Sequence, residues 1–289
     1  MTRPPFVSLL ASAWQRTGSM LCVGLDPLPG DLPAGLPPTP AGCLEFCTQI
    51  VDSVADLVCA FKPQAAHFGA IGAEAELAAL IAYIHARHPG VPVILDAKRG
   101  DIGATAELYA REVFERYGAD AATVSPFLGP EGLQPFLKRR ERGVLVLCRT
   151  SNPDSRFLQG ASDAEAEPAF VRIARAANDW NEAGNVMLVT GGTYPGDLAR
   201  IRSVAPEIPF LVPGIGAQGG DVAAVVAAGR RRTGFGLAIS ASRTVLYASR
   251  ANDFTEAARA AALALNRAIV AAYQREPRAP RDDRLPQAT

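Results

Sequence analysis

Eight short apolar runs alternate along the chain with segments of helical periodicity, and this alternation constrains the fold more than any other feature. Runs that are almost wholly apolar are typical of strands buried on both faces of a parallel sheet. Eight successive strand–helix units predict an α/β fold, a closed (β/α)8 TIM barrel in a single domain. The predicted strands are Met20–Leu25, Leu57–Phe61, Val91–Leu95, Ala121–Val124, Val144–Cys148, Val186–Val189, Phe210–Val212 and Gly236–Ile239.

An open, doubly wound sheet is the alternative arrangement of these elements. Such sheets more often have about five to seven strands and a glycine-rich first turn. The first turn here, Gly24–Pro27, reads GLDP and has no such pattern. The barrel is therefore predicted to span residues 1–274, with an extra helix over Pro5–Arg16 that closes its bottom. The charged, proline-rich tail, residues 275–289, is predicted to be disordered.

The segments between the strands are predicted to be helices or loops. The proline-rich stretch Pro27–Pro40 is expected to be a loop and not a domain linker, because the alternation resumes directly after it. A longer loop is expected over Ser151–Pro168, and long loops in compact domains are often functional. The predicted helices include Ala73–Arg87, Thr105–Tyr117, Ala166–Ala183 and Asp253–Tyr273.

Charge and cysteine content exclude several classes of protein. Lys and Arg total 29, as do Asp and Glu, and this balance argues against general nucleic-acid binding or polybasic membrane binding. No run of roughly 18 apolar residues and no signal-peptide core are present, so a soluble cytoplasmic protein is expected. The odd number of cysteines does not suggest a disulfide framework. Buried, reduced thiols are expected, and nothing near Cys43 and Cys47 supports a zinc site.

Charged side chains end three of the predicted strands. Asp26 ends the first strand and Lys62 the second, while Asp96 ends the third, followed by Lys98. Because active sites of such barrels lie at the carboxyl ends of the strands, we expect a cluster in the barrel mouth. Asp96 and Lys98 are two apart on an extended segment and should face the same side. A structural ion-pair network is the alternative. Asp101, in the following loop, either faces solvent or reaches another subunit's site.

A phosphate site is predicted at the ends of the seventh and eighth strands. The glycine-rich turn Pro213–Gly220 precedes a predicted helix, Asp221–Ala228, and backbone N–H groups there can hold a phosphate. Arg243 can add a bidentate contact after the eighth strand. The loops after these two strands are the usual phosphate position of this fold. An ordinary tight turn is the alternative.

A lysine is the candidate proton carrier. No Ser-His-Asp or Cys-His arrangement occurs at the strand ends, and His67, His85 and His88 lack the spacing of metal ligands. A structural or surface role is therefore expected for the histidines. An ammonium group among carboxylates stays protonated and can act as a general acid.

The motif at residues 96–102, DAKRGDI, resembles the D-x-K-x-x-D-I signature of the orotidine 5′-phosphate decarboxylase family in its bacterial form. The D-x-K-x-x-D pattern alone is shared with sugar-phosphate relatives in the same superfamily. The resemblance is more specific because it includes GLDP at 24–27, FKPQ at 61–64, VPGIGAQ at 212–218 and Ser242-Arg243. It covers about residues 20–250, which is nearly the whole predicted barrel.

The resemblance implies a role for each matching residue. Lys62, Asp96 and Lys98 form a charged network around C6 of a pyrimidine, and Asp101 enters from the partner subunit of a homodimer. The implied substrate-binding residues are Asp26 and Lys62 at the ribose hydroxyls, Thr105 at the ribose across the dimer, Thr150 or Ser151 at the pyrimidine amide, and Gln218 and Arg243 at the 5′-phosphate with Ser242 beside them.

The family reaction removes CO2 from orotidine 5′-monophosphate and gives UMP, the last step of de novo pyrimidine nucleotide synthesis, with Lys98 protonating C6. The resemblance implies no metal and no cofactor. One alternative is a Mg²⁺-dependent sugar-phosphate decarboxylase or aldolase, which needs an acidic ligand near the second strand, where this chain has Lys62. The other is a nucleotide-binding protein without catalysis, which the intact charged set disfavours.

Overall fold

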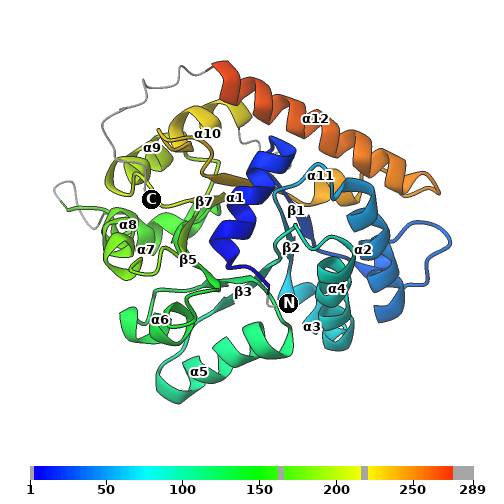
Figure 1. Ribbon diagram of the computed structural model, residues 1–289, viewed down its shortest axis with the longest axis horizontal. Coiled ribbons are helices and arrows are strands. Elements are labelled where there is room, and N and C mark those ends of the chain that lie inside the picture. Colours follow the sequence, from blue (N-terminus) through cyan, green and yellow to red (C-terminus); the bar gives the residue numbers. More distant parts are fainter. Residues whose placement is uncertain (1–2, 162–165, 216–220, 276–289) are drawn as a thin grey trace.

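The computed structural model describes residues 3–161, 166–215 and 221–275 (Figure 1). In these residues eight parallel strands form one sheet, in the order β2-β1-β8-β7-β6-β5-β4-β3. Bridges from Phe61 to Val93 and from Gln64 to Asp96 join β2 to β3 and close the sheet, so the predicted (β/α)8 barrel is confirmed. The strands are β1 Leu21–Leu25, β2 Ala60–Pro63, β3 Ile94–Arg99, β4 Ala121–Val124, β5 Gly143–Arg149, β6 Val186–Thr190, β7 Phe210–Val212 and β8 Leu237–Ala241.

Helices surround the barrel on its outer side (Figure 1). A 3₁₀ turn over Pro29–Asp31 interrupts the proline-rich loop after β1. The helices are α1 Phe6–Thr17, α2 Pro40–Val54, α3 Ala65–Gly69, α4 Glu74–Arg87, α5 Gly103–Arg111, α6 Pro130–Leu137, α7 Arg156–Gln159, α8 Ala169–Trp180, α9 Pro195–Val204, α10 Val222–Gly229, α11 Arg243–Leu246 and α12 Phe254–Arg275. Of the predicted tail, residues 276–289 lie outside the described residues.

Two predicted strands lie earlier in the chain than the observed ones. β2 and β3 both begin and end later than the apolar runs that predicted them. The apolar residues before them, such as Val58 and Val91, are buried but precede the residues assigned to the two strands. The ladder instead continues past the apolar layer to Lys62 and Asp96, whose charges pair with each other in the barrel mouth. An apolar run in the sequence therefore marks buried residues, whereas the strand pairing of β2 and β3 continues beyond that run to the charged residues at the barrel mouth.

Local chemistry also moves several helix boundaries. The helix expected from Ala166 begins only at Ala169, because Pro168 precedes it as the N-cap residue. The helix expected over Thr105–Tyr117 begins at Gly103 and widens into a π-helical turn over Glu112–Arg116. The segment expected to be a loop after β5 contains a 3₁₀ turn, Pro153–Ser155, followed by the short helix α7.

Helix α1 covers the amino-terminal ends of the strands, opposite the expected site. The Trp14 indole donates a hydrogen bond to the carbonyl oxygen of Leu237 at the start of β8, at 2.9 Å. The Phe6 ring packs against Gly143 at the start of β5, where a Cβ atom would overlap the ring. The bottom of the barrel is therefore filled by side chains of α1, and the opposite end is left for chemistry.

The cysteines are all free and buried, as expected for reduced thiols. Burial raises the pKa of the Cys22 thiol to about 12, and it raises the pKa of Cys47 and Cys59 well above the usual value. These thiols are therefore unreactive near neutral pH. Among the helices of the described residues, none combines the length and the apolar character that a membrane span requires.

Asp120, directly before β4, joins the bottom of the barrel to the chain's amino-terminal segment. It is 2% exposed and accepts hydrogen bonds from the Val93 backbone, from Arg3 and from His85. Burial alone would raise the pKa of Asp120, but the bonds from His85 and Arg3 outweigh it, and the pKa lies below its usual value. The ionised carboxylate therefore stabilises the fold.

We predict that Asp120→Asn lowers the free energy of unfolding by about 1–3 kcal/mol at pH 5, because a buried charged hydrogen-bond acceptor is lost. Because the folded pKa is the lower one, this stabilisation is present above the unfolded pKa, near 4, and is lost as the pH falls through the folded pKa. Urea unfolding of wild type and variant between pH 5 and pH 3 measures the difference. A penalty that stays constant over this range would contradict the assignment.

Candidate active site

A cavity of about 270 Å³ opens at the carboxyl ends of the strands. Its wall is formed by residues of the carboxyl-terminal parts of β1, β2, β3, β5, β7 and β8 or of the loops that follow them, so residues far apart in the sequence meet there. Six of the residues predicted from the sequence line this cavity: Asp26, Lys62, Asp96, Ser151, Ser242 and Arg243.

The centre of the site is a carboxylate held between two ammonium groups. Asp96 Oδ2 lies 2.8 Å from Lys62 Nζ, and Asp96 Oδ1 lies 2.6 Å from Lys98 Nζ. Lys62 is 5% exposed and Asp96 is 7% exposed. The alternating cluster that the sequence predicted is thus present in the geometry, with Asp96 in the middle.

The ion pairs keep both buried groups charged. Burial would raise the pKa of Asp96, but the Lys62 and Lys98 charges outweigh burial and hold that pKa far below its usual value. Burial would lower the pKa of Lys62, but Asp96 and then Asp26 raise it above the usual value. The site therefore presents fixed charges over the whole physiological pH range.

Lys98 reaches Asp96 through a strained backbone. Its φ of +46° lies in the left-handed region, and it is the only non-glycine residue of the described chain with a positive φ. Such a conformation costs about 1–3 kcal/mol and is found at functional sites. The side chains of Asp96 and Lys98 do meet, as expected. The expected reason, a regular extended backbone, is wrong, because Lys98 has a left-handed φ. Pairing between β3 and β4 is irregular here, which permits the turn.

Thr123 of β4 fixes this strained segment. Its hydroxyl accepts a hydrogen bond from the Lys98 backbone N–H at 2.9 Å and donates one to Asp96 Oδ1 at 2.9 Å. Thr123 is 1% exposed, so its hydroxyl makes both bonds away from bulk solvent. One hydroxyl thus holds both the backbone of the lysine and the carboxylate that the lysine contacts.

The Lys98 side chain lies at the rim of the site. It is 49% exposed and lines an adjoining hollow of about 480 Å³ with residues 64–67, 69 and 70, outside the lining of the mouth cavity itself. Its ammonium group therefore reaches Asp96 from the side that this chain leaves open to solvent.

Asp26 and the β1 loop form the opposite wall. Asp26 Oδ1 is buried and has no hydrogen-bond partner within the described residues. The Tyr247 hydroxyl holds the loop by accepting from the Leu28 N–H and donating to the Asp26 carbonyl. A Cβ at Gly24 would overlap the Ser242 hydroxyl, so β1 and the β8 loop approach closely only with glycine there. The unpartnered carboxylate oxygen fits a ligand hydroxyl.

The geometry distinguishes the two candidates at the end of β5. Ser151 lines the mouth cavity, whereas Thr150 does not. The Thr150 hydroxyl is instead bonded to Asn152 Oδ1 at 2.7 Å and to the Gln159 side chain. The Thr150 hydroxyl is therefore used within the loop, whereas Ser151 faces the cavity.

The predicted phosphate site lies only partly within the described residues. Arg243 and the backbone of Pro213–Ile215 line the cavity, as expected, while Gln218 and the rest of residues 216–220 lie outside the described residues. The N-terminus of α10 was expected to hold a phosphate, but the Asp221 carboxylate caps it by accepting from the Ala223 N–H at 2.8 Å. The Asp221 carboxylate adds a negative charge at this helix N-terminus, and the phosphate site there stays a prediction.

Asp101 and Thr105 do not reach the cavity of their own chain. The Asp101 carboxylate accepts from the Ile102 N–H at 2.8 Å in the loop after β3. Thr105 is exposed on α5, where it lines an outer groove with Leu108 and Tyr109. Their role across a dimer stays a prediction. No group of three His, Cys, Asp or Glu side chains arranged as a metal site occurs among the described residues.

Comparison with known proteins shows which family this chain belongs to. Residues 19–261 match the model of the orotidine 5′-phosphate decarboxylase / HUMPS family. The chain belongs to this family. A curated orotidine 5′-phosphate decarboxylase from Azoarcus sp. (strain BH72) is 56% identical over 265 residues, which cover 91% of this chain and 98% of that protein. The one from Cupriavidus taiwanensis is 55% identical over 262 residues, 89% of this chain and 95% of that protein.

The fold agrees with this family. The structure of Leishmania donovani OMP decarboxylase superposes with a TM-score of 0.81 at 38% sequence identity, covering 94% of this chain and all of that chain. The DAKRGDI segment, residues 96–102, starts within β3 and continues past its carboxyl end, at the end of the barrel where active sites of this fold lie.

Sequence reasoning missed several residues of the site. Thr123 lies within an apolar strand run and carries no sequence signal of its own. His67, expected to be structural, lines the mouth cavity, and its Nδ1 lies 3.1 Å from the Pro27 carbonyl oxygen. Tyr247 could be found only from the fold, because its partners lie more than two hundred residues away.

We predict that Thr123→Val lowers kcat/KM about 10–100-fold, because two buried hydrogen bonds, one to a charged group, are lost at the catalytic centre. Thr123→Ser keeps the hydroxyl and should stay within about threefold of wild type. Steady-state kinetics of the two variants, with circular dichroism to confirm folding, make the comparison. Equal activity of the Val and Ser variants would show that the hydroxyl does not position Lys98.

Proposed function

We propose that this chain removes CO2 from orotidine 5′-monophosphate to give UMP, with Lys62, Asp96 and Lys98 as the catalytic centre. The observation that carries the proposal is the buried carboxylate between two ammonium groups, set in the mouth of a barrel of the decarboxylase family. Arg243 lies on the wall of the same cavity, where it can hold the substrate phosphate. The site thus offers charges for both ends of a nucleotide.

The charges suit the chemistry of the step. When the bond between C6 and the carboxylate carbon breaks, its electron pair stays on C6 of the pyrimidine. The Lys98 ammonium stabilises this negative charge and then transfers a proton to C6, which forms the C–H bond of UMP. Lys98 regains its proton from water after the product leaves. A preorganised cation stabilises the developing charge without a cost of reorganisation.

Each remaining residue holds one part of the substrate. Asp26, with its unpartnered buried oxygen, and Lys62 bind the ribose hydroxyls. Ser151 contacts the amide of the pyrimidine, and Arg243 with Ser242 binds the 5′-phosphate. Interactions distant from C6 then supply binding energy that keeps the reacting group against the charged centre.

A second copy of the chain completes the site. Lys98 is half-exposed in one chain, whereas a stabilising charge acts best where water is excluded. Asp101 of the partner subunit would approach Lys98 there, and the partner's Thr105 would reach the ribose. The exposed apolar side chains around these two residues provide the surface that a dimer buries: Ile102, Leu108, Phe127 and Leu128.

We predict that Lys98→Ala lowers kcat for orotidine 5′-monophosphate by about 10²–10⁴-fold, because the general acid is removed. Lys138→Ala, at an exposed lysine after α6, is the matched control and should keep wild-type activity. Ultraviolet absorbance follows substrate loss, and circular dichroism confirms the fold. Most of the activity remaining in Lys98→Ala would remove Lys98 from the mechanism.

We further predict that mixing Lys98→Ala and Asp101→Ala chains restores activity. A mixed dimer has one site with both substitutions and one with neither, so random exchange of subunits returns about a quarter of wild-type activity. Two different affinity tags isolate the mixed dimer, and its turnover is compared with that of each parent. An isolated mixed dimer as inactive as its parents would contradict the shared site.

A further inference from the structure

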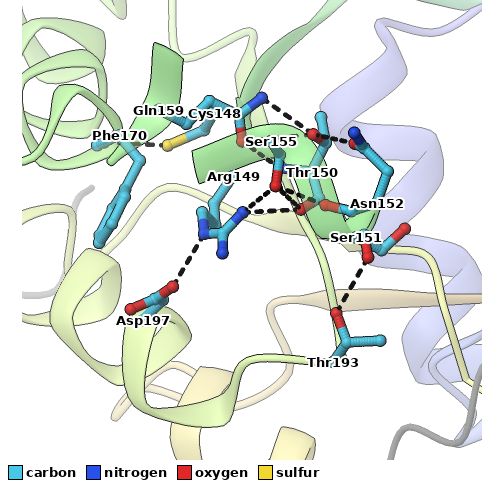
Figure 2. A network of polar contacts seen from close by, with 10 residues as sticks. All are labelled: Cys148, Arg149, Thr150, Ser151, Asn152, Ser155, Gln159, Phe170, Thr193 and Asp197. Atoms are coloured by element: carbon cyan, nitrogen blue, oxygen red, sulfur yellow. Dashed lines mark hydrogen bonds and ion pairs between the residues drawn. The ribbon is translucent and has the colours of Figure 1, made fainter. Parts of the chain in front are cut away.

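Arg149, the last residue of β5, is buried beside the mouth cavity without lining it. Figure 2 shows its polar contacts. Its exposed fraction is 1%, and it lies next to the turn that carries Ser151 into the mouth cavity. An arginine is almost never fully buried unless its charge is paired. In Arg149, Nε and Nη1 donate hydrogen bonds, whereas Nη2 is buried without a partner among the described residues. The contacts of this guanidinium therefore indicate what it does.

One side of the guanidinium is fixed by the segment after β6. Arg149 Nε donates to Asp197 Oδ2 at 2.8 Å, and the guanidinium carbon lies 3.9 Å from the centre of the Tyr194 ring. Asp197 belongs to the first turn of α9, and Tyr194 directly precedes that helix. The arginine is thus anchored to a regular element that does not itself enter the cavity.

The other side of the guanidinium holds the turn after β5. Arg149 Nη1 donates to the Thr150 carbonyl at 3.0 Å and to the Ser155 hydroxyl. That hydroxyl in turn donates to the Asn152 carbonyl at 2.6 Å. The carbonyl groups of Thr150 and Asn152, the residues on either side of Ser151, are therefore held by one arginine and one serine, as Figure 2 shows.

The backbone after β6 restrains the same turn from its other face. The Gly191 N–H donates to the Arg149 carbonyl at 2.5 Å, and a Cβ at Gly191 would lie 2.8 Å from the backbone N of Ser151. The Thr193 hydroxyl donates to the Ser151 carbonyl at 3.4 Å. Ser151 is thus held between two backbones, with little freedom to move.

We propose that Arg149 is a positioning residue, which places Ser151 for contact with the pyrimidine through its bonds to Thr150, Ser155 and Asp197. This inference rests on the proposed function and deepens it. The planar guanidinium donates in two directions at once, to Asp197 and to the turn, which a lysine ammonium on a flexible chain does not reproduce. Arg149 never touches the substrate, so its effect passes through Ser151.

The test compares two ligands that differ by the base. UMP carries the pyrimidine, whereas ribose 5-phosphate has only the sugar and the phosphate, and calorimetry gives the Kd of each without turnover. We expect Arg149→Met to raise the Kd of UMP about tenfold, as Ser151→Ala does, because one hydrogen bond to the base is lost. The Kd of ribose 5-phosphate should stay within about twofold of wild type.

The double variant shows whether the two residues act together. If Arg149 works through Ser151, Arg149→Met combined with Ser151→Ala should raise the Kd of UMP no further than about tenfold, instead of about a hundredfold. Arg149→Lys should give an intermediate loss. Arg156→Met is the matched control, since Arg156 is an exposed arginine of α7 whose side chain makes no hydrogen bond to the turn among the described residues.

Several outcomes would overturn the inference. They are an unchanged Kd of UMP in Arg149→Met, equal losses for UMP and ribose 5-phosphate, and multiplicative losses in the double variant. If Arg149→Met does not fold, Ser155→Ala takes its place and should raise the Kd of UMP alone by about threefold. A wild-type chain that does not convert orotidine 5′-monophosphate refutes the proposed function, whereas an active wild type with insensitive variants refutes only the role of Arg149.

Discussion

The buried carboxylate of Asp96 between the ammonium groups of Lys62 and Lys98 is the interaction on which the rest of the site depends. Charges removed from water are costly unless each is paired at close range, so the three side chains must be held at fixed distances. Lys62 comes from β2 and the other two from β3, and closure of the barrel between these strands brings them together. The fold and the charged centre therefore depend on the same strand contact.

The conformation of the charged centre is held by neighbouring residues that do not take part in the reaction. Lys98 has a left-handed backbone, and Thr123 satisfies its N–H while bonding the carboxylate. On the opposite side of the mouth, Tyr247 holds the β1 loop. The strain is sustained because the surrounding strands are buried and well paired, and because the bottom of the barrel is closed by α1. Because the strands are fixed in this way, the loops at the mouth can carry the polar side chains of the site without disturbing the strand register.

Much of the architecture could be predicted from sequence because apolar runs of strand length mark buried parallel strands. The charged residues of the centre could also be predicted, since Lys62 and Asp96 each directly follow such a run and Lys98 lies two residues after Asp96. The backbone at Lys98 could not, because DAKRGDI contains no glycine at that position and gives no sign of a positive φ. Thr123 was hidden within an apolar run. The choice between Thr150 and Ser151 required the hydrogen bonds of Gln159, which lies on a short helix that was expected to be loop.

The central claim is that these fixed charges decarboxylate orotidine 5′-monophosphate without help from a metal. Proton NMR of the purified chain with this substrate and excess EDTA tests the claim most directly. We expect the substrate signals to disappear and an equal amount of UMP to appear, at the same rate with and without the chelator. Substrate that binds but is not converted, or turnover that stops when EDTA is added, would contradict the account.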